Sequence, residues 1–156
     1  ELYETPSLLP IKEILSHIPA EFERVRVMRL KAGTKIRKHT DKVDKAIKNK
    51  DIIRVHVPLK TGFDVSMHIW EGKEKKTYKL ETGKYYYTDV TKPHAVDNNA
   101  DFDRLHLVVD CYNNPKMSTL IDQTFEYTEN NRDTRFDPFK DTSIEGKDWH
   151  FEYFKV

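Results

Sequence analysis

The sequence predicts one mainly β domain with antiparallel strands, of the jelly-roll type. Three observations lead to this fold class. Apolar residues alternate with polar ones in several short segments, glycines fall between those segments, and only two stretches have helical spacing. Short strands separated by frequent turns favour an antiparallel sandwich or barrel over alternating strand–helix units. A chain of 156 residues also has the size of a single domain.

The individual elements follow from the spacing of the apolar residues. Residues 8–18 place apolar side chains at helical intervals after Ser7, a suitable cap, with Pro10 near the first turn. A second helix is predicted at residues 117–125. From Val25 onward the period becomes two, which predicts strands at residues 25–30, 52–59, 65–70, 76–80, 85–90, close to 94, and 104–111.

The strands define a core of about residues 25–111, followed by a C-terminal extension, residues 112–156. This extension carries too many Phe, Tyr and Trp residues for a solvated linker. We expect it to pack on the barrel, on a partner subunit in a homodimer, or over an opening as a lid.

The composition limits the kinds of partner. The 27 basic and 26 acidic side chains give a formal charge of +1, so no broad attraction to nucleic acid or to an anionic membrane is expected. Cys111 is the only cysteine, which excludes an internal disulfide and fits a reducing compartment. No apolar run approaches the roughly 20 residues of a membrane span, and the first residues lack the pattern of a signal peptide. We therefore expect a cytoplasmic protein with a small-molecule partner.

Two of the predicted strands carry polar side chains along one whole face. In residues 52–59, Arg54 and His56 share the face opposite the valines and isoleucine. In residues 104–111, Arg104, His106 and Asp110 share one face in the same way. Two interpretations remain open, because this face either meets water or lines a ligand cavity inside a closed barrel.

The histidines indicate where such a cavity would carry chemistry. His39 and Asp41 lie two residues apart, so in an extended chain their side chains point the same way. A triplet of this kind arises easily by chance. Residues 150–152, HFE, form a second one, which we interpret as unrelated to metal binding. The first triplet is distinguished by His94, which is followed ten residues later by Arg104. Two histidines and one carboxylate form the facial triad of non-haem iron(II) oxygenases.

An arginine inside a barrel needs a partner, because burying an unpaired charge costs several kcal/mol. A dicarboxylate cosubstrate that chelates iron with one end would offer its other carboxylate to Arg104. Two other classes stay open at this point. A cupin-type metalloenzyme with a non-oxidative reaction would not need Arg104 inside, and a small-ligand-binding module would not need the triad.

Four blocks of sequence together resemble a known family, the aspartyl/asparaginyl β-hydroxylases, which include bacterial proline hydroxylases. The blocks are RVMRLKAGTKIRKHTD, IIRVHVPL, IWEGK and KPHAVDNNADFDRLHLVVD, and they extend over roughly residues 25–111. The resemblance implies a double-stranded β-helix, a cupin-like jelly roll, that binds iron(II) and 2-oxoglutarate. It implies that the enzyme uses O2 to hydroxylate a C–H bond and releases succinate and CO2.

The resemblance also implies roles for individual residues. His39, Asp41 and His94 match the metal ligands, Arg104 matches the clamp on the distal carboxylate of 2-oxoglutarate, and Arg54 with His56 matches a pair that helps to hold the cosubstrate. The animal enzymes have glycine in place of the carboxylate ligand, so Asp41 places this chain closer to the bacterial amino-acid hydroxylases. The expected substrate is therefore an amino acid or a similar molecule, either free or within a peptide.

Further positions are candidates for supporting roles. Asn98 and Asp110 are candidates to support His94 and Arg104, and each could equally cap a turn or end a strand. The substrate carboxylate would need a cationic partner, and the candidates are Arg26, Arg37, Arg132 and Arg135.

Overall fold

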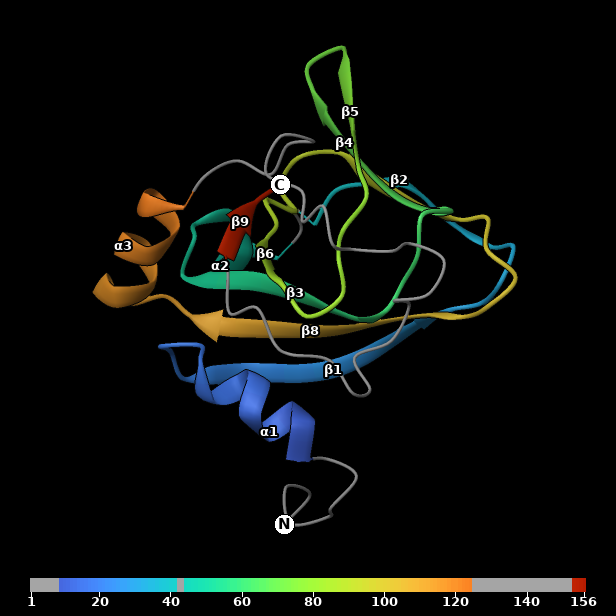
Figure 1. The fold of residues 1–156 in the computed structure, drawn as a ribbon. Coiled ribbons are helices and arrows are strands. Elements are labelled where there is room, and N and C mark those ends of the chain that lie inside the picture. Colours follow the sequence, from blue (N-terminus) through green and yellow to red (C-terminus); the bar gives the residue numbers. More distant parts are fainter. Residues whose placement is uncertain (1–8, 42–43, 125–152) are drawn as a thin grey trace.

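The computed structural model describes residues 9–41, 44–124 and 153–156, which form two β-sheets and three helices (Figure 1). The five-stranded sheet has the order β1 (Phe22–Leu30), β8 (Arg104–Tyr112), β3 (Ile52–Lys60), β6 (Tyr85–Tyr87) and β9 (Tyr153–Lys155). The four-stranded sheet has the order β2 (Lys35–His39), β7 (His94–Asn98), β4 (Val65–Glu71) and β5 (Glu74–Tyr78). The helices are α1 (Leu9–Ser16), α2 (Lys45–Lys48) and α3 (Pro115–Gln123).

The path of the chain between the sheets makes this a jelly roll. From β1 to β4 the strands alternate between the large and the small sheet, and β6, β7 and β8 alternate again. Strand pairs are antiparallel, except that β9 joins β6 in parallel. The predicted fold class, a mainly β jelly roll with a short N-terminal helix, is confirmed.

The apolar stripes of the large sheet point outward and are covered by helices. Val55 on β3 and Val109 on β8 are fully buried against Ile14 of α1 and Met117 of α3. Figure 1 shows α1 below β1 and α3 at one end of the sheet. Because the outer face is occupied in this way, the opposite stripes of β3 and β8 face the space between the sheets. The interpretation with a cavity inside the barrel is therefore the correct one.

A second apolar cluster fills part of the space between the sheets. It joins Leu30 of β1 and Tyr86 of β6 to Met67 of β4 and Val96 of β7. Tyr86 is fully buried, and its hydroxyl accepts a hydrogen bond from the Glu81 backbone N–H at 2.9 Å. The cluster holds the two sheets together beside the polar cavity.

Three elements were not predicted from the sequence. Strand β2 is mostly exposed and rich in lysine, so it lacks the half-buried alternation by which a strand is recognised. Helix α2 has a single turn with Asp44 as its cap, and β9 has only three residues. Each depends on contacts that are remote in sequence or too short to leave a periodic signal.

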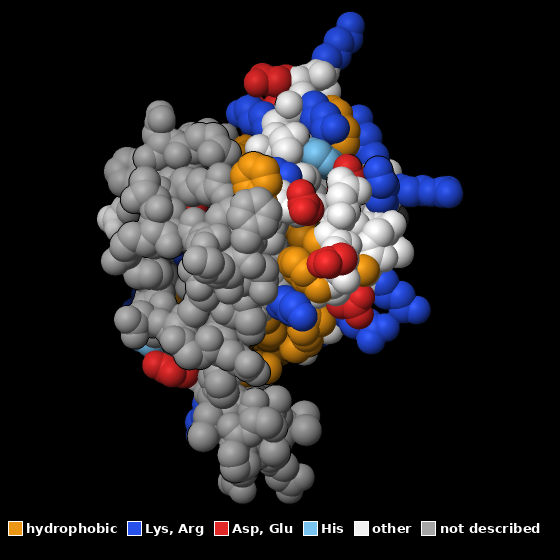
Figure 2. Space-filling model, turned by 45° about the vertical axis from the view of Figure 1, so that its right-hand side comes forward, with side chains coloured by type: hydrophobic (Ala, Val, Ile, Leu, Met, Phe, Trp, Pro, Cys, Tyr) orange, Lys and Arg blue, Asp and Glu red, His pale blue; other side chains and the backbone are white. Residues whose placement is uncertain are grey.

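The described residues include no helix that is long and apolar enough to cross a membrane. On the face drawn in Figure 2, acidic and basic side chains are interspersed, and basic side chains project from the tip of the β4–β5 hairpin. The C-terminal extension, for which packing on the barrel, a partner interface and a lid were the alternatives, lies outside the described residues apart from residues 112–124, which include α3, and residues 153–156, which include β9.

Candidate metal centre and its cavity

Two histidines and one aspartate meet at one end of the small sheet. His39 ends β2 and pairs directly with His94, the first residue of β7, while Asp41 follows β2 closely. The ligand atoms of the three side chains all lie within 4.8 Å of one another. His39 Nε2 is 3.6 Å from Asp41 Oδ1, and His94 Nε2 is 4.0 Å from Asp41 Oδ2. The structure thus brings together the three residues that the sequence predicted as metal ligands.

Both imidazoles are oriented by backbone carbonyl groups. His39 Nδ1 lies 2.8 Å from the Arg37 carbonyl oxygen, and His94 Nδ1 lies 2.8 Å from the Lys92 carbonyl oxygen. A carbonyl oxygen only accepts, so in each ring Nδ1 carries the proton and donates it. Each Nε2 therefore presents its lone pair to the centre of the group, which is the arrangement of metal-binding histidines.

Burial and position also suit His94 to metal binding. Burial lowers the pKa of His94 from its ordinary value, and a positive charge on His39 would act in the same direction. A neutral imidazole is the form that binds a metal. The backbone position of Asp41 is fixed by a hydrogen bond, which its N–H donates to the Val90 carbonyl at 2.9 Å. The described residues contain no other group of three His, Cys, Asp or Glu side chains with this metal-binding geometry.

The three ligands open into a cavity of about 250 Å³ between the two sheets. The remaining predicted site residues, Arg104, Arg54 and His56, line the same cavity. Apolar walls come from Met67, Val96 and Val108. All six predicted residues are therefore brought to one cavity, although they come from four strands and one connection.

Arg104 is the buried arginine that the sequence predicted. It is only 4% exposed, and burial lowers its pKa to about 10. Its Nε atom is buried without a hydrogen-bond partner in the described part of the chain, and its Nη1 is 3.3 Å from His106 Nδ1. A buried guanidinium without a carboxylate partner is costly, so this site is suited to a ligand that brings an anionic group.

Arg54 makes contacts that the sequence did not predict. Its Nη1 donates to Asp41 Oδ2 at 2.7 Å, and its Nε donates to Asp110 Oδ1 at 2.7 Å. Although burial opposes the charge, the hydrogen bond and the charge of Asp110 raise the pKa of Arg54 above its ordinary value. Arg54 therefore connects a candidate metal ligand to a carboxylate in the barrel wall.

The two positions expected to support His94 and Arg104 serve other partners. Asp110, with its side chain 1% exposed, accepts from Arg54 and from Arg26 Nη2 at 2.8 Å. The Asn98 side chain holds a turn, donating to the carbonyls of Leu30, Lys31 and Phe102 and accepting from the Ala100 N–H. The Asn98 contacts match the alternative role at a turn, whereas Asp110 acts on the site through Arg54 rather than through Arg104.

His106 is a site residue to which the sequence reasoning assigned no role. Its Nδ1 lies 3.4 Å from His56 Nδ1, and its Nε2 is buried without a hydrogen-bond partner among the described residues. Burial, followed by the charge of Arg104, lowers the pKa of both His56 and His106 well below the ordinary value. The sequence did contain a sign that His106 belongs to the site, because the alternation of residues 104–111 places His106 on the same strand face as Arg104.

The other candidates lie away from this cavity or outside the described residues. His68 is on the other face of the small sheet, where its ring contacts Thr77 Oγ1 at 2.9 Å and Asp97 Oδ2 at 3.0 Å. Arg26 lines the cavity, whereas Arg37 is exposed. Outside the described residues lie His150, Arg132 and Arg135.

The chain resembles known proteins both in sequence and in fold. The profile of the family described as Aspartyl/Asparaginyl beta-hydroxylase matches residues 5–114. No curated protein sequence matches the chain.

Several solved structures resemble the fold. A non-heme monooxygenase in a nickel complex, ThoJ-Ni, has 17% identity and a TM-score of 0.46, over 69% of this chain and 50% of that chain. A vicilin from Solanum melongena has 17% identity and a TM-score of 0.45, over 72% of this chain and 25% of that one. A cupin domain from Bordetella pertussis Tohama I has 21% identity and a TM-score of 0.41, over 61% of this chain and 88% of that one.

The chain spans half the length of that monooxygenase and a quarter of that vicilin, and at these identities the likeness concerns the fold alone. The match to the family profile does establish the family. It covers well over half of the 156 residues, and the matched range includes every candidate metal ligand. The chain therefore belongs to the aspartyl/asparaginyl β-hydroxylase family.

Proposed function

We propose that the chain is an iron(II)- and 2-oxoglutarate-dependent dioxygenase that hydroxylates an unactivated C–H bond of an amino acid or a similar molecule. The observation that carries the proposal is one cavity with a His–Asp–His group at one side and, in its wall, a buried arginine that has no carboxylate partner among the described residues. When bound, the metal and cosubstrate would supply the oxidation, in which O2 and 2-oxoglutarate are converted to succinate and CO2 and one oxygen atom enters the C–H bond.

The donor set fits iron(II) better than zinc. Two imidazole nitrogens and one carboxylate oxygen leave several coordination positions free, as in the facial triad. Structural zinc sites more often close a tetrahedron, frequently with cysteine, and Cys111 is buried elsewhere with its pKa raised to about 12 by burial. The open positions would accept the chelating end of the cosubstrate.

The remaining residues of the cavity would bind and orient. Arg104 is placed to form two parallel hydrogen bonds with the distal carboxylate of 2-oxoglutarate. Arg54 holds the Asp41 carboxylate by a 2.7 Å hydrogen bond and so limits its rotation. His56 remains neutral because of its depressed pKa, and Met67, Val96 and Val108 exclude water from the cavity.

Charge balance supports a substrate with an anionic group. Three arginines and two aspartates line or support the cavity, namely Arg26, Arg54, Arg104, Asp41 and Asp110. This excess of one positive charge remains after a divalent ion and a dianionic cosubstrate are added, because their charges cancel. Arg26 is the candidate for the substrate carboxylate, since it lines the cavity and its Nε has no partner among the described residues.

Succinate release tests the proposal. The purified chain with iron(II), 2-oxoglutarate and air is screened against free amino acids and short peptides, and we expect at least one to stimulate succinate formation. His39→Ala and His94→Ala should abolish that formation, whereas His17→Ala, at an exposed histidine away from the cavity, should retain it. Succinate formation that persists in both triad variants would refute the assignment, and a non-oxidative metalloenzyme or a binding module would remain if no succinate formed under any condition.

A further inference from the structure

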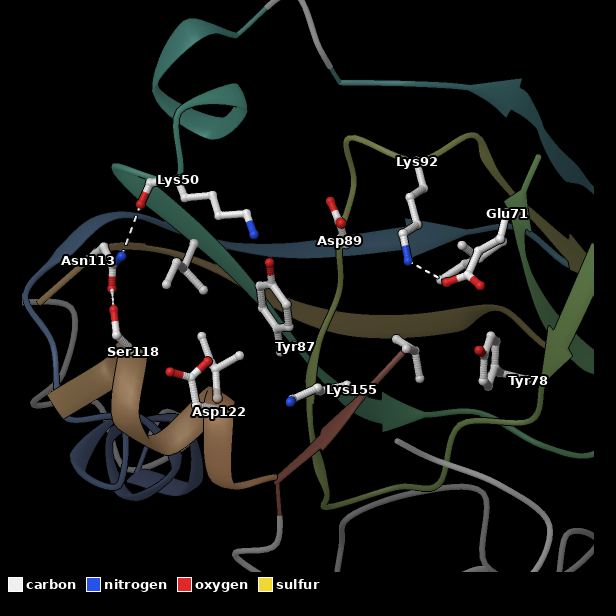
Figure 3. A pocket seen from close by; sticks show the side chains of 14 residues that line it. Lys50, Glu71, Tyr78, Tyr87, Asp89, Lys92, Asn113, Ser118, Asp122 and Lys155 are labelled. Atoms are coloured by element: carbon white, nitrogen blue, oxygen red, sulfur yellow. Dashed lines mark hydrogen bonds and ion pairs between the residues drawn. The ribbon is translucent and has the colours of Figure 1, made fainter. Parts of the chain in front are cut away.

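A second pocket, of about 430 Å³, lies where strands β6 and β9 approach helix α3 (Figure 3). It shares no lining residue with the metal cavity. Ile53 of β3 faces this pocket, whereas its neighbour Arg54 faces the cavity. Because adjacent residues of a strand point to opposite faces, the two hollows lie on opposite sides of one wall.

Several polar groups of this pocket have no partner in the described part of the chain. The ammonium groups of Lys50 and Lys155 form no ion pair there, and the carboxylate of Asp122 forms none either. The Tyr87 hydroxyl makes no hydrogen bond with any residue that the structure describes, and burial, followed by the charge of Asp89, raises its pKa so that it stays a donor. The pocket thus presents unpaired groups of both charges around one hollow.

The backbone of Lys50 gives an independent reason to assign a role to its side chain. Lys50 follows the last turn of α2 with a φ of 61°, and it is the only described residue other than glycine with a positive φ. Glycine is preferred at this position after a helix, since a side chain there costs about 1 kcal/mol. The Lys50 carbonyl is fixed by the Asn113 side chain at 3.1 Å. Figure 3 shows the Lys50 side chain extending toward the Tyr87 hydroxyl.

The ligand follows from these groups taken together. Three basic and three acidic side chains line the pocket, so it is neutral overall and favours neither a simple anion nor a simple cation. Ile53 and Ile121 provide an apolar surface beside the charges. We propose that the pocket binds a free α-amino acid with an apolar side chain, whose carboxylate accepts from Lys50 and Tyr87 and whose ammonium group faces Asp122. The proposal is independent of oxygenase chemistry, because no residue of the metal cavity takes part.

The pocket is connected to the metal centre through the segment between β6 and β7. Asp89 and Lys92 of this segment line the pocket with their side chains. In the same segment, the Val90 carbonyl accepts from the Asp41 N–H at 2.9 Å, and the Lys92 carbonyl accepts from His94 Nδ1 at 2.8 Å. This segment therefore borders both the pocket and the metal centre.

Calorimetric titration of the metal-free chain with L-leucine tests this site. We expect saturable binding that is weakened about tenfold or more by Lys50→Gly and by Asp122→Asn, each of which removes one charged contact. Lys48→Ala, at an exposed lysine of α2 that does not line the pocket, should bind like the unaltered chain. Lys50→Gly relieves the unfavourable φ, so its free energy of unfolding should not fall and lost binding would not reflect unfolding.

Two ligand analogues and one cavity variant complete the test. N-acetyl-leucine lacks the ammonium group and leucinamide lacks the carboxylate, so both should bind at least about tenfold more weakly than leucine. His39→Ala should bind leucine normally, since His39 belongs to the metal cavity. The proposal is wrong if leucine does not bind, if binding is unchanged in Lys50→Gly and Asp122→Asn, or if His39→Ala alone removes it.

Discussion

At the residue scale, the proposed role of Arg104 depends on the absence of a carboxylate partner for its guanidinium among the described residues. It is buried at the wall of the metal cavity, and its Nε has no hydrogen-bond partner in the described residues. Burial lowers its pKa to about 10, which leaves it charged at neutral pH. The protein thus retains a desolvated cation that a carboxylate would stabilise, which is the expected cost of a site prepared for an anionic ligand.

Replacing Arg104 should therefore affect binding more than folding. We expect Arg104→Ala to weaken 2-oxoglutarate binding by about 100-fold, equivalent to about 2.7 kcal/mol, because two charge-assisted hydrogen bonds are lost. The free energy of unfolding should stay equal or rise, since an unpaired buried charge is removed. Arg29→Ala, at an exposed arginine on β1, is the control. Normal cosubstrate affinity in Arg104→Ala would show that the clamp lies elsewhere.

At the scale of elements, Asp110 ties three neighbouring strands together. From β8 it accepts hydrogen bonds from Arg54 on β3 and Arg26 on β1, and its side chain is 1% exposed. The strand register accounts for the contact between Arg54 and Asp110, because the two residues lie directly opposite each other on β3 and β8. The same contact orients Arg54 toward the candidate ligand Asp41.

Asp110→Asn should therefore lower the free energy of unfolding by about 3 kcal/mol, because among the described residues it leaves the partly buried Arg26 guanidinium without a carboxylate partner and leaves Arg54 paired with Asp41 alone. Denaturant unfolding measures this difference. Asp103→Asn, which removes the charge of an exposed pair with Arg29, should cost at most about 1 kcal/mol. Equal effects of the two substitutions would contradict a special role for Asp110.

Helix α3 belongs to the fold rather than to the metal centre. Met117 is fully buried against the outer face of the large sheet, on the side away from the cavity. Met117→Ala should cost about 2–5 kcal/mol of unfolding free energy by leaving a cavity, while the affinity for a divalent metal stays unchanged. Thr119→Ala, at an exposed position of the same helix, should have little effect on either quantity. A large loss of metal affinity in Met117→Ala at a temperature where it is folded would mean that the two faces are coupled.

At the scale of the whole molecule, the fold was predictable and the contacts within the site were only partly so. Alternation in residues 52–59 and 104–111 identified two stripes on each strand, but it did not decide which stripe met water. That choice depends on α1 and α3 covering the outer face, a tertiary contact that periodicity does not encode. The metal ligands and Arg104 were found because their residue types are unusual at such positions.

The unpredicted contacts depend on strand register. The Arg54–Asp110 pair and the His56–His106 pair join residues more than forty positions apart, so local spacing contains no sign of them. Strand β2 was missed because its side chains are mostly exposed and charged, and its pairing with β7 is what places His39 opposite His94.

The buried His56–His106 pair should make stability depend on pH. Burial lowers the pKa of both rings well below 6.5, so the folded chain keeps them neutral where the unfolded chain binds protons. Their contribution is complete above the unfolded pKa near 6.5 and is lost as the pH falls below it, by about 1.4 kcal/mol per pH unit for each ring.

The unfolding free energy should accordingly fall more steeply between about pH 6.5 and 5 in the unaltered chain than in His106→Leu, which removes one of the two rings. His17→Leu, at an exposed histidine, is the matched control and should leave the slope unchanged. An identical slope in His106→Leu would mean that His106 is protonated in the folded protein.

The coordination of one iron(II) ion and 2-oxoglutarate by His39, Asp41, His94 and Arg104 can be tested most directly by anaerobic visible spectroscopy. Iron(II) is added to the chain with 2-oxoglutarate in the absence of O2, and we expect the weak charge-transfer band of a chelated complex. The band should be absent in His94→Ala and should need far more 2-oxoglutarate in Arg104→Ala. No band in the unaltered chain at saturating iron(II) and 2-oxoglutarate, or an undiminished band in His94→Ala, would contradict the assignment of this cavity.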